Sequence, residues 1–180
     1  MSYIATENIS IFPLSKERPK KRENNIFYES NVANILRQLI DTEGFIITPP
    51  SDATELLRVE NGSLKLQKSL MFNIYGYYVE ISSGASLADN VAKDDVFYAC
   101  IKIKDNEIDG QDNDSDKYEG LNIVTDISNL TGEEYHSLPL FEITKIDGDK
   151  CECKFIQDSY TKIQPKSFDF SIDFIDGKRD

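Results

Sequence analysis

The chain has 180 residues, of which 39% are hydrophobic, and a formal net charge of −12. This length allows one domain with a sizeable core, whereas the charge argues against binding to duplex nucleic acid or to an anionic membrane, since both depend on lysine and arginine. No stretch approaches the roughly 18 apolar residues of a membrane span, and the N-terminus lacks the layout of a signal peptide, so we expect a protein made in a cytosol.

The first 25 residues are expected to form an extended arm, because Pro13 and Pro19 interrupt a stretch of mixed apolar and basic character. The side chains suited to docking onto a neighbouring subunit are apolar at its start and basic further on: Ile11, Phe12, Leu14, Lys20, Lys21 and Arg22. A solvated tail is the alternative. If the arm docks, deletion of residues 1–25 is expected to leave residues 26–180 folded as a single β-rich domain but to abolish assembly.

One helix is predicted, over residues 30–43. Its apolar residues follow the i, i+3, i+4, i+7 spacing of a single buried stripe: Val32, Ile35, Leu36, Leu39 and Ile40. Ser30 or Asn31 is placed to cap its start, and Gly44 to end it. We expect this helix to pack on a sheet formed by the strands that follow.

The most apolar stretch, Leu70 to Ile81, predicts a core strand. Large apolar side chains alternate up to Ile74 and again from Tyr77, but the pattern shifts by one residue at Gly76. A glycine at such a shift is typical of a β-bulge. We therefore expect one continuous strand with a bulge, in which Tyr75 points out and Tyr77 points in.

Further strands are predicted from alternation and turn signals. Asn61-Gly62 and Asp147-Gly148-Asp149 each indicate a hairpin, and residues 82–95 indicate a loop. The expected strands cover residues 44–48, 56–60, 64–66, 96–104, 121–127, 139–146, 151–156 and 168–174. Several short strands after one helix predict a mainly β fold, either a β-sandwich or a flattened barrel.

Residues 105–119 form the most acidic segment, with seven acids and one lysine, a net −6 of the total −12. Five oxygen-bearing side chains fall at the first, third, fifth, ninth and twelfth places of a calcium loop: Asp105, Glu107, Asp109, Asn113 and Asp116. The match is partial, because the twelfth place lacks the usual glutamate and both flanks are predicted strands. The alternative is a solvated hairpin tip without a metal.

The three cysteines and the single histidine do not predict an active site. Cys151 and Cys153 share one strand face, but structural zinc usually takes four ligands, so Cys100 and His136 would have to converge on them. Small core residues are the favoured interpretation. His136 lacks a glycine-framed serine or another nucleophile in a recognisable pattern. We expect no enzyme and no cofactor other than the calcium already considered.

Five segments together carry a resemblance to a known class: FPLSKERPKKR, ESNVANILRQLIDTEGFIIT, FNIYGYYVEI, DDVFYACIKI and SLPLFEI. In their order they resemble small virion proteins of tailed bacteriophages, from the tail, baseplate or capsid surface. The resemblance implies a β-rich, non-enzymatic structural protein of the virion, made in the host cytoplasm. It also implies a homo-oligomer that exchanges arms with its neighbours and contacts other virion proteins.

Two other functions remain open at this point. One is a β-sandwich binding module for a carbohydrate or protein ligand, with the acidic loop as its calcium site. Its signature would be exposed aromatics around a concave face, here Tyr75, Tyr77, Tyr78 and Tyr98. The other is a small acidic inhibitor that imitates nucleic-acid charge, which the concentration of half the net charge in one loop disfavours.

Overall fold

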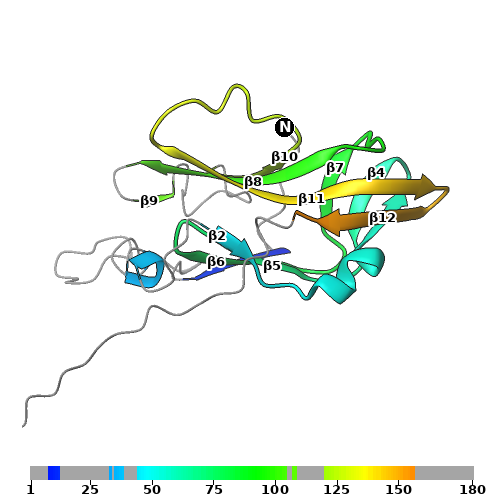
Figure 1. Cartoon of the computed structure of the whole chain (residues 1–180), viewed down its shortest axis with the longest axis horizontal. Helices are drawn as coiled ribbons and strands as arrows, with labels where there is room; N and C mark the ends of the chain where they lie inside the picture. The colour runs from blue at the N-terminus through cyan, green and yellow to red at the C-terminus, as the bar shows by residue number, and fades with distance from the viewer. Residues whose placement is uncertain are drawn as a thin grey trace, which may run out of the picture.

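The computed structural model describes residues 8–12, 33, 35–38, 44–104, 107–108 and 120–156. This part of the chain is mainly β, as predicted, and consists of two antiparallel sheets (Figure 1). The smaller sheet has the order β1 (Ile9–Phe12), β6 (Tyr77–Ile81), β5 (Leu70–Ile74), β2 (Gly44–Ile46).

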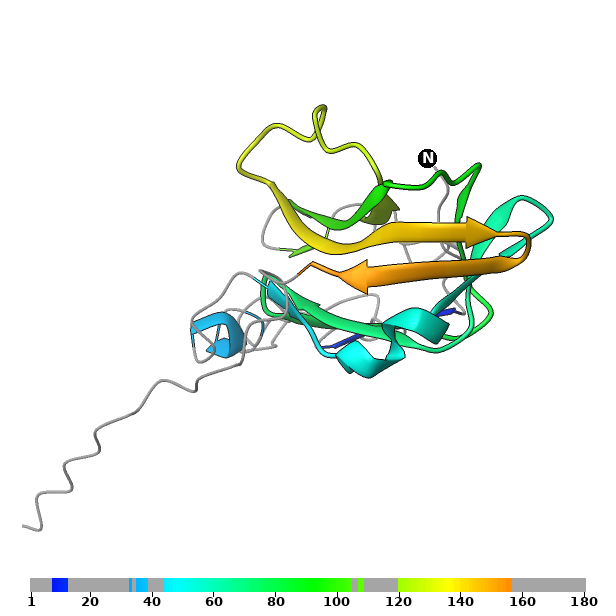
Figure 2. The same cartoon turned by 45° about the vertical axis from the view of Figure 1, so that its right-hand side comes forward.

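The larger sheet curls into a nearly closed seven-stranded barrel, the second of the two architectures expected from the sequence. Its order is β10 (Leu121–Val124), β8 (Val96–Lys104), β11 (Tyr135–Asp147), β12 (Lys150–Phe155), β3 (Leu57–Glu60), β4 (Ser63–Leu66), β7 (Ser86–Asp89). A short strand, β9 (Glu107–Ile108), pairs with β8 beside this path. A 3₁₀ helix, η2 (Pro50–Glu55), packs below the β11–β12 hairpin (Figure 2).

Both predicted hairpin turns are confirmed. Asn61 and Gly62 join β3 to β4 with φ angles of 52° and 79°, as a two-residue type I′ turn requires. Gly148 joins β11 to β12 with a φ of 60°. These turns match the right-handed twist of the paired strands, so local sequence is sufficient to start both hairpins.

The predicted single strand over Leu70–Ile81 is wrong. The structure has two strands, β5 and β6, which pair with each other in register from Leu70 opposite Ile81 to Ile74 opposite Tyr77. Tyr75 (φ 51°) and Gly76 (φ 85°) form the turn between them, and the Asn73 side chain accepts a hydrogen bond from the Gly76 amide at 3.2 Å. The shift in the alternation therefore marks a chain reversal, because a two-residue turn changes the phase of the pattern as a bulge does.

The predicted helix is only partly visible. Ala33 and residues 35–38 are helical, the rest of residues 30–43 lies outside the described part, and no described helix reaches seven residues. The predicted buried stripe is wrong at Ile35, which is 50% exposed, whereas Ala33 is buried. A small side chain faces inward here because Gly76 packs directly against the Ala33 backbone.

The two sheets enclose one continuous hydrophobic core. Phe72 and Val79 of the smaller sheet belong to the same buried cluster as Leu64 and Phe97 of the barrel. Phe97, Ala99 and Ile101 share one face of β8 and are all fully buried, and the Phe97 ring stacks on Phe141 with centroids 5.0 Å apart. Burial of these large side chains supplies most of the driving force for the fold.

The N-terminal residues 9–12 are part of the body of the protein. They form β1, which pairs with β6 of the same chain, and bury Ile9 and Ile11 in the core, while Phe12 is 57% exposed. The expectation that deletion of residues 1–25 leaves the fold intact stays a prediction, and the place of β1 in the sheet argues against it because the deletion would remove a core strand. None of the described helical segments has the length and apolarity needed to cross a membrane.

Candidate functional site: the open seam of the barrel

The barrel has an open seam between its first and last strands, β7 and β10. β7 pairs with β4 on its other side and β10 pairs with β8, but within the described residues β7 and β10 approach each other without forming a ladder. Among the described strands, β7 and β10 are thus each paired on one side only. Such edge strands are the places where proteins accept an added segment.

A pocket of about 570 Å³ occupies this seam. Its apolar surface comes from the partly exposed Val91, Val124 and Leu130, which lie over the buried Leu87 and Phe97. Its rim is polar and acidic, and the described residues that line it include no lysine or arginine. The lining consists of Leu87, Ala88, Asp89, Asn90, Val91, Asp95, Phe97, Ile123, Val124, Thr125, Asp126, Asn129 and Leu130.

One side of the rim is the connection from β7 to β8, which is held in place by its backbone. Asn90 and Asp94 adopt left-handed φ angles of 57° and 71°, which these two residue types tolerate better than most. The Asp94 amide donates to the Ile143 carbonyl and the Ile143 amide to the Asp95 carbonyl, both at 2.9 Å. The Asp95 carboxylate in turn accepts from the Ala92 amide at 2.7 Å. This side of the pocket is therefore preformed.

The opposite side follows β10 and carries Asp126. Its carboxylate accepts a hydrogen bond from the Ser128 amide at 2.8 Å, and hydrogen bonds from the Ser128 side chain and backbone lower the pKa of Asp126. On the other side of the seam, Asp89 of β7 accepts a hydrogen bond from the Ser63 hydroxyl of the neighbouring strand β4 at 2.5 Å. With Asp95, the rim presents three formal negative charges around an apolar base, which suits a ligand that combines cationic and apolar groups.

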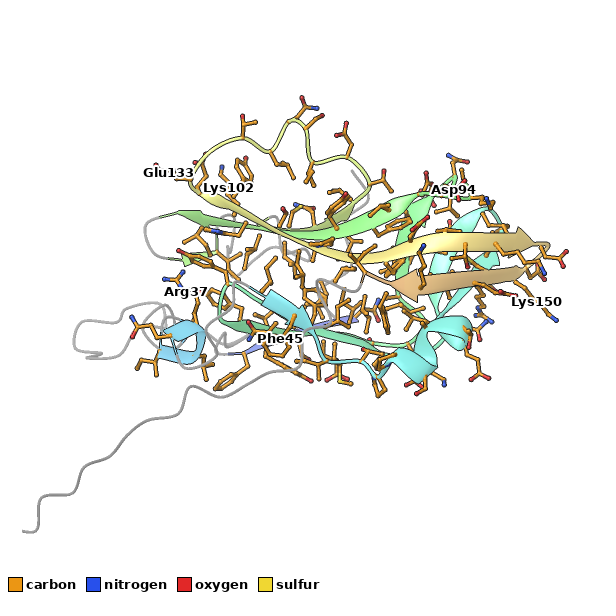
Figure 3. The ribbon with its side chains drawn as sticks, in the orientation of Figure 1. Arg37, Phe45, Asp94, Lys102, Glu133 and Lys150 are labelled. Carbon is orange, nitrogen blue, oxygen red and sulfur yellow. The ribbon has the colours of Figure 1, made fainter. Side chains whose placement is uncertain are left out.

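A second feature lies at the other end of the molecule, where two aromatic rings and one guanidinium group stack. The Tyr75 ring stacks on His136 of β11 with centroids 3.5 Å apart and an interplanar angle of 17°. The Arg37 guanidinium lies over the same Tyr75 ring, 3.9 Å from its centroid. Figure 3 shows Arg37 at the same end as Lys102 and Glu133, far from Asp94 along the long axis. The stack ties the helical segment and the β5–β6 turn to the barrel.

The aromatic signature of a carbohydrate module is not formed by the four tyrosines. Tyr77 is buried in the core with 2% of its surface exposed, as the alternation predicts, so it is not part of the exposed aromatic face that a carbohydrate module would need. Tyr75 is engaged in the stack with His136. Tyr78 and Tyr98 are partly buried and lie on strands of different sheets. His136, predicted in a loop that enters a strand, lies within β11 itself.

The cysteines are buried core residues, in agreement with the favoured interpretation. Cys100, Cys151 and Cys153 are free thiols with at most 4% exposure, and Cys153 donates to the Ala53 carbonyl at 3.1 Å. Burial raises the pKa of Cys100 and Cys151 from 9.0 to about 11, and that of Cys153 to about 12. Over the described ranges, no three histidine, cysteine or acidic side chains are grouped as metal ligands.

These pKa values predict that alkaline pH destabilises the protein. The unfolded chain releases its thiol protons near pH 9, whereas the folded chain keeps them up to pH 11–12. The contribution of the three thiols to stability is therefore fully present below pH 9. It declines above pH 9, until the folded thiols also ionise, with a limiting slope of about 1.4 kcal/mol per pH unit for each thiol. Urea titrations at several pH values measure this slope. A matched Cys100→Ala, Cys151→Ala, Cys153→Ala variant should show a smaller decline, and an equal decline in both proteins would contradict the prediction.

Most of the acidic loop lies outside the described residues. Asp105, Asp109, Asn113 and Asp116 are among those not described, and Glu107 is described only as part of the β9 backbone, which pairs with β8. The calcium site therefore stays a prediction. Of the docking residues predicted in the arm, Ile11 is buried in its own subunit and Phe12 is exposed, whereas Leu14, Lys20, Lys21 and Arg22 lie outside the described part.

Sequence reasoning missed the seam. Residues 82–95 were expected to be a loop, but they contain β7 (Ser86–Asp89), and the pocket depends on the fact that β7 and β10 meet without pairing. A signal for the strand exists in the alternation of Ala85 and Leu87, both fully buried, with the more exposed Ser86 and Ala88. No local signal identifies the seam itself, since its two sides are more than 30 residues apart.

The chain was also compared with known proteins. It matches no protein-family model, and no curated protein is significantly similar to it.

Proposed function

We propose that the protein is a non-enzymatic structural protein of a tailed-phage particle, which assembles with itself and with other virion proteins. The observation that carries this proposal is the open seam, where two sheet edges border a pocket with an apolar base and an acidic rim. A surface of this kind suits a protein segment better than a reaction, because it offers backbone edges, apolar area and charge in one place. The resemblance of the chain to small virion proteins is consistent with this role.

The edges of the smaller sheet add two further docking surfaces. β1 and β2 are the outer strands of that sheet in the described part of the chain. Phe12 at the end of β1 is 57% exposed, and residues 13–25 of the predicted arm follow it in the sequence. In this proposal, assembly uses the outer strands β1 and β2 together with the segment that follows Phe12.

The pocket also supports a second candidate, a binding module for a small ligand. A volume of about 570 Å³ falls within the range of small-molecule sites, and the combination of an apolar base with a few polar groups is typical of them. A polar, cationic small molecule would fit the three rim aspartates. We rank this candidate second because the pocket lies between two strands that, in the described part of the chain, end the strand order of the barrel.

The experiment that tests assembly is light scattering coupled to size-exclusion chromatography on the full chain. We expect oligomers whose mass rises with concentration, and a clean monomer at tens of micromolar would contradict self-assembly. The variant Lys20→Gln with Lys21→Gln should reduce the mass. Lys145→Gln with Lys150→Gln, which removes the same charge from the exposed β11–β12 hairpin, is the matched control and should leave the mass unchanged.

A further inference from the structure

The seam pocket calls for an occupant with apolar and basic side chains, and the chain contains one segment of that composition. Residues 13–22 carry Leu14 followed by five basic residues against one glutamate: Lys16, Arg18, Lys20, Lys21 and Arg22. The pocket offers the complement, with partly exposed apolar lining residues and the carboxylates of Asp89, Asp95 and Asp126. By contrast, the apolar residues of the C-terminal stretch 168–174 alternate with Asp169 and Asp173, so that stretch would meet the rim with like charge.

The register of the smaller sheet indicates which copy supplies this segment. Phe12 lies opposite Tyr78, and Ala33 packs on Gly76, so the described residues on either side of 13–32 both lie at the turn end of the β5–β6 hairpin. The chain leaves the opposite end of β6, at Ile81, before it enters β7 and the seam. A second copy can present the segment to the seam without the detour that its own chain would have to make.

We propose that the seam pocket of one copy binds residues 13–22 of another copy. Leu14 lies against the partly exposed apolar residues of the lining, Val91, Val124 and Leu130. Lys20, Lys21 and Arg22 face the rim aspartates. This inference rests on the proposed function and names the interface that would produce the assembly.

The rim can be tested without disturbing its local hydrogen bonds. Asp89→Asn, Asp95→Asn and Asp126→Asn each keep a side-chain oxygen that accepts from Ser63, Ala92 and Ser128. The triple variant should weaken self-association about tenfold, since exposed ion pairs are individually weak but add up over three sites, and it should also lose the salt dependence of the wild type. Asp147→Asn, an exposed acid on the far hairpin, is the control and should have no effect.

A charge exchange distinguishes binding between copies from binding within one. One full-length variant carries Lys20→Glu and Lys21→Glu, and the other carries Asp89→Lys and Asp126→Lys. Each alone should be mainly monomeric by analytical ultracentrifugation, and an equimolar mixture should form heterodimers, because only a mixed pair joins an acidic arm to a basic rim. Circular dichroism and thermal melts verify that both variants are folded, and the asparagine series decides the result if they are not.

The outcomes separate this inference from the proposed function. If the wild type oligomerises but neither the asparagine variant nor the charge exchange changes its mass, the seam is not the arm site, while assembly itself stands. If the wild type is monomeric at every concentration, self-assembly is contradicted. The inference then fails as well, because it requires one copy to bind another.

Discussion

Gly76→Ala is expected to lower the free energy of unfolding by about 3 kcal/mol or more, because the added methyl group would meet packed backbone. A β-carbon at this position would lie 2.0 Å from the Ala33 carbonyl oxygen, and the φ of 85° disfavours any L side chain. The left-handed conformation alone costs about 1–2 kcal/mol, and displacement of packed backbone adds a further 1–3 kcal/mol. Urea unfolding followed by circular dichroism measures the loss.

Gly62→Ala is the matched control for this substitution. Gly62 occupies the same second place of a two-residue turn, with a φ of 79°, but nothing lies within 4 Å of the β-carbon it would gain. It should lose only the conformational part, about 1–2 kcal/mol. The difference between the two variants reports the contact between the helical segment and the β5–β6 turn. Equal losses would show that this contact contributes nothing to stability.

Loss of the core contacts of β1 is expected to cause the second large decrease in the free energy of unfolding. Ile9→Ala should cost about 2–5 kcal/mol, because Ile9 is 1% exposed and its truncation leaves a cavity in the core. Phe12→Ala, at the other end of the same strand, should cost less than about 1 kcal/mol since Phe12 is 57% exposed. Chemical denaturation of the two variants side by side gives both values.

Deletion of residues 1–12 extends this test from a side chain to the whole strand. The deletion should destabilise the protein by more than Ile9→Ala alone, because it also leaves the β6 edge without its partner. We expect the truncated chain to aggregate or to melt well below the wild type. A truncated chain with wild-type stability would show that β1 is dispensable and would restore the view of residues 1–25 as a separable arm.

Much of the local structure could be predicted because its causes are local. Asn61-Gly62 determines a hairpin, since both residues accept positive φ, and the alternation in Val96–Lys104 determines which face of β8 is buried. The misinterpretation of Leu70–Ile81 has a definite reason. A glycine that shifts the alternation by one residue fits both a bulge and a two-residue turn, and the choice depends on whether β5 and β6 pair with each other or with other strands.

The candidate site could not be predicted from the sequence, for a different reason. Asp89 and Asp126 are unremarkable acids in the sequence, and they become the rim of one pocket only because β7 and β10 end the strand order of the barrel side by side. Likewise, Tyr75 and His136 are 61 positions apart in the numbering of the chain and meet only when the β5–β6 turn packs on β11. Pairings of this kind are long-range, so no window of sequence contains both partners.

The sequence by itself determined that the chain is mainly β, that its hairpins turn at Asn61-Gly62 and Gly148, and that its cysteines are core residues. These features follow from backbone preferences and from apolar periodicity, which act over a few residues. Only the tertiary structure decided that residues 9–12 complete a sheet, that Ala33 rather than Ile35 faces inward, and that the barrel stays open between β7 and β10. These features depend on how residues that are distant in the sequence pack against one another, and that packing is stabilised only once the whole core has formed.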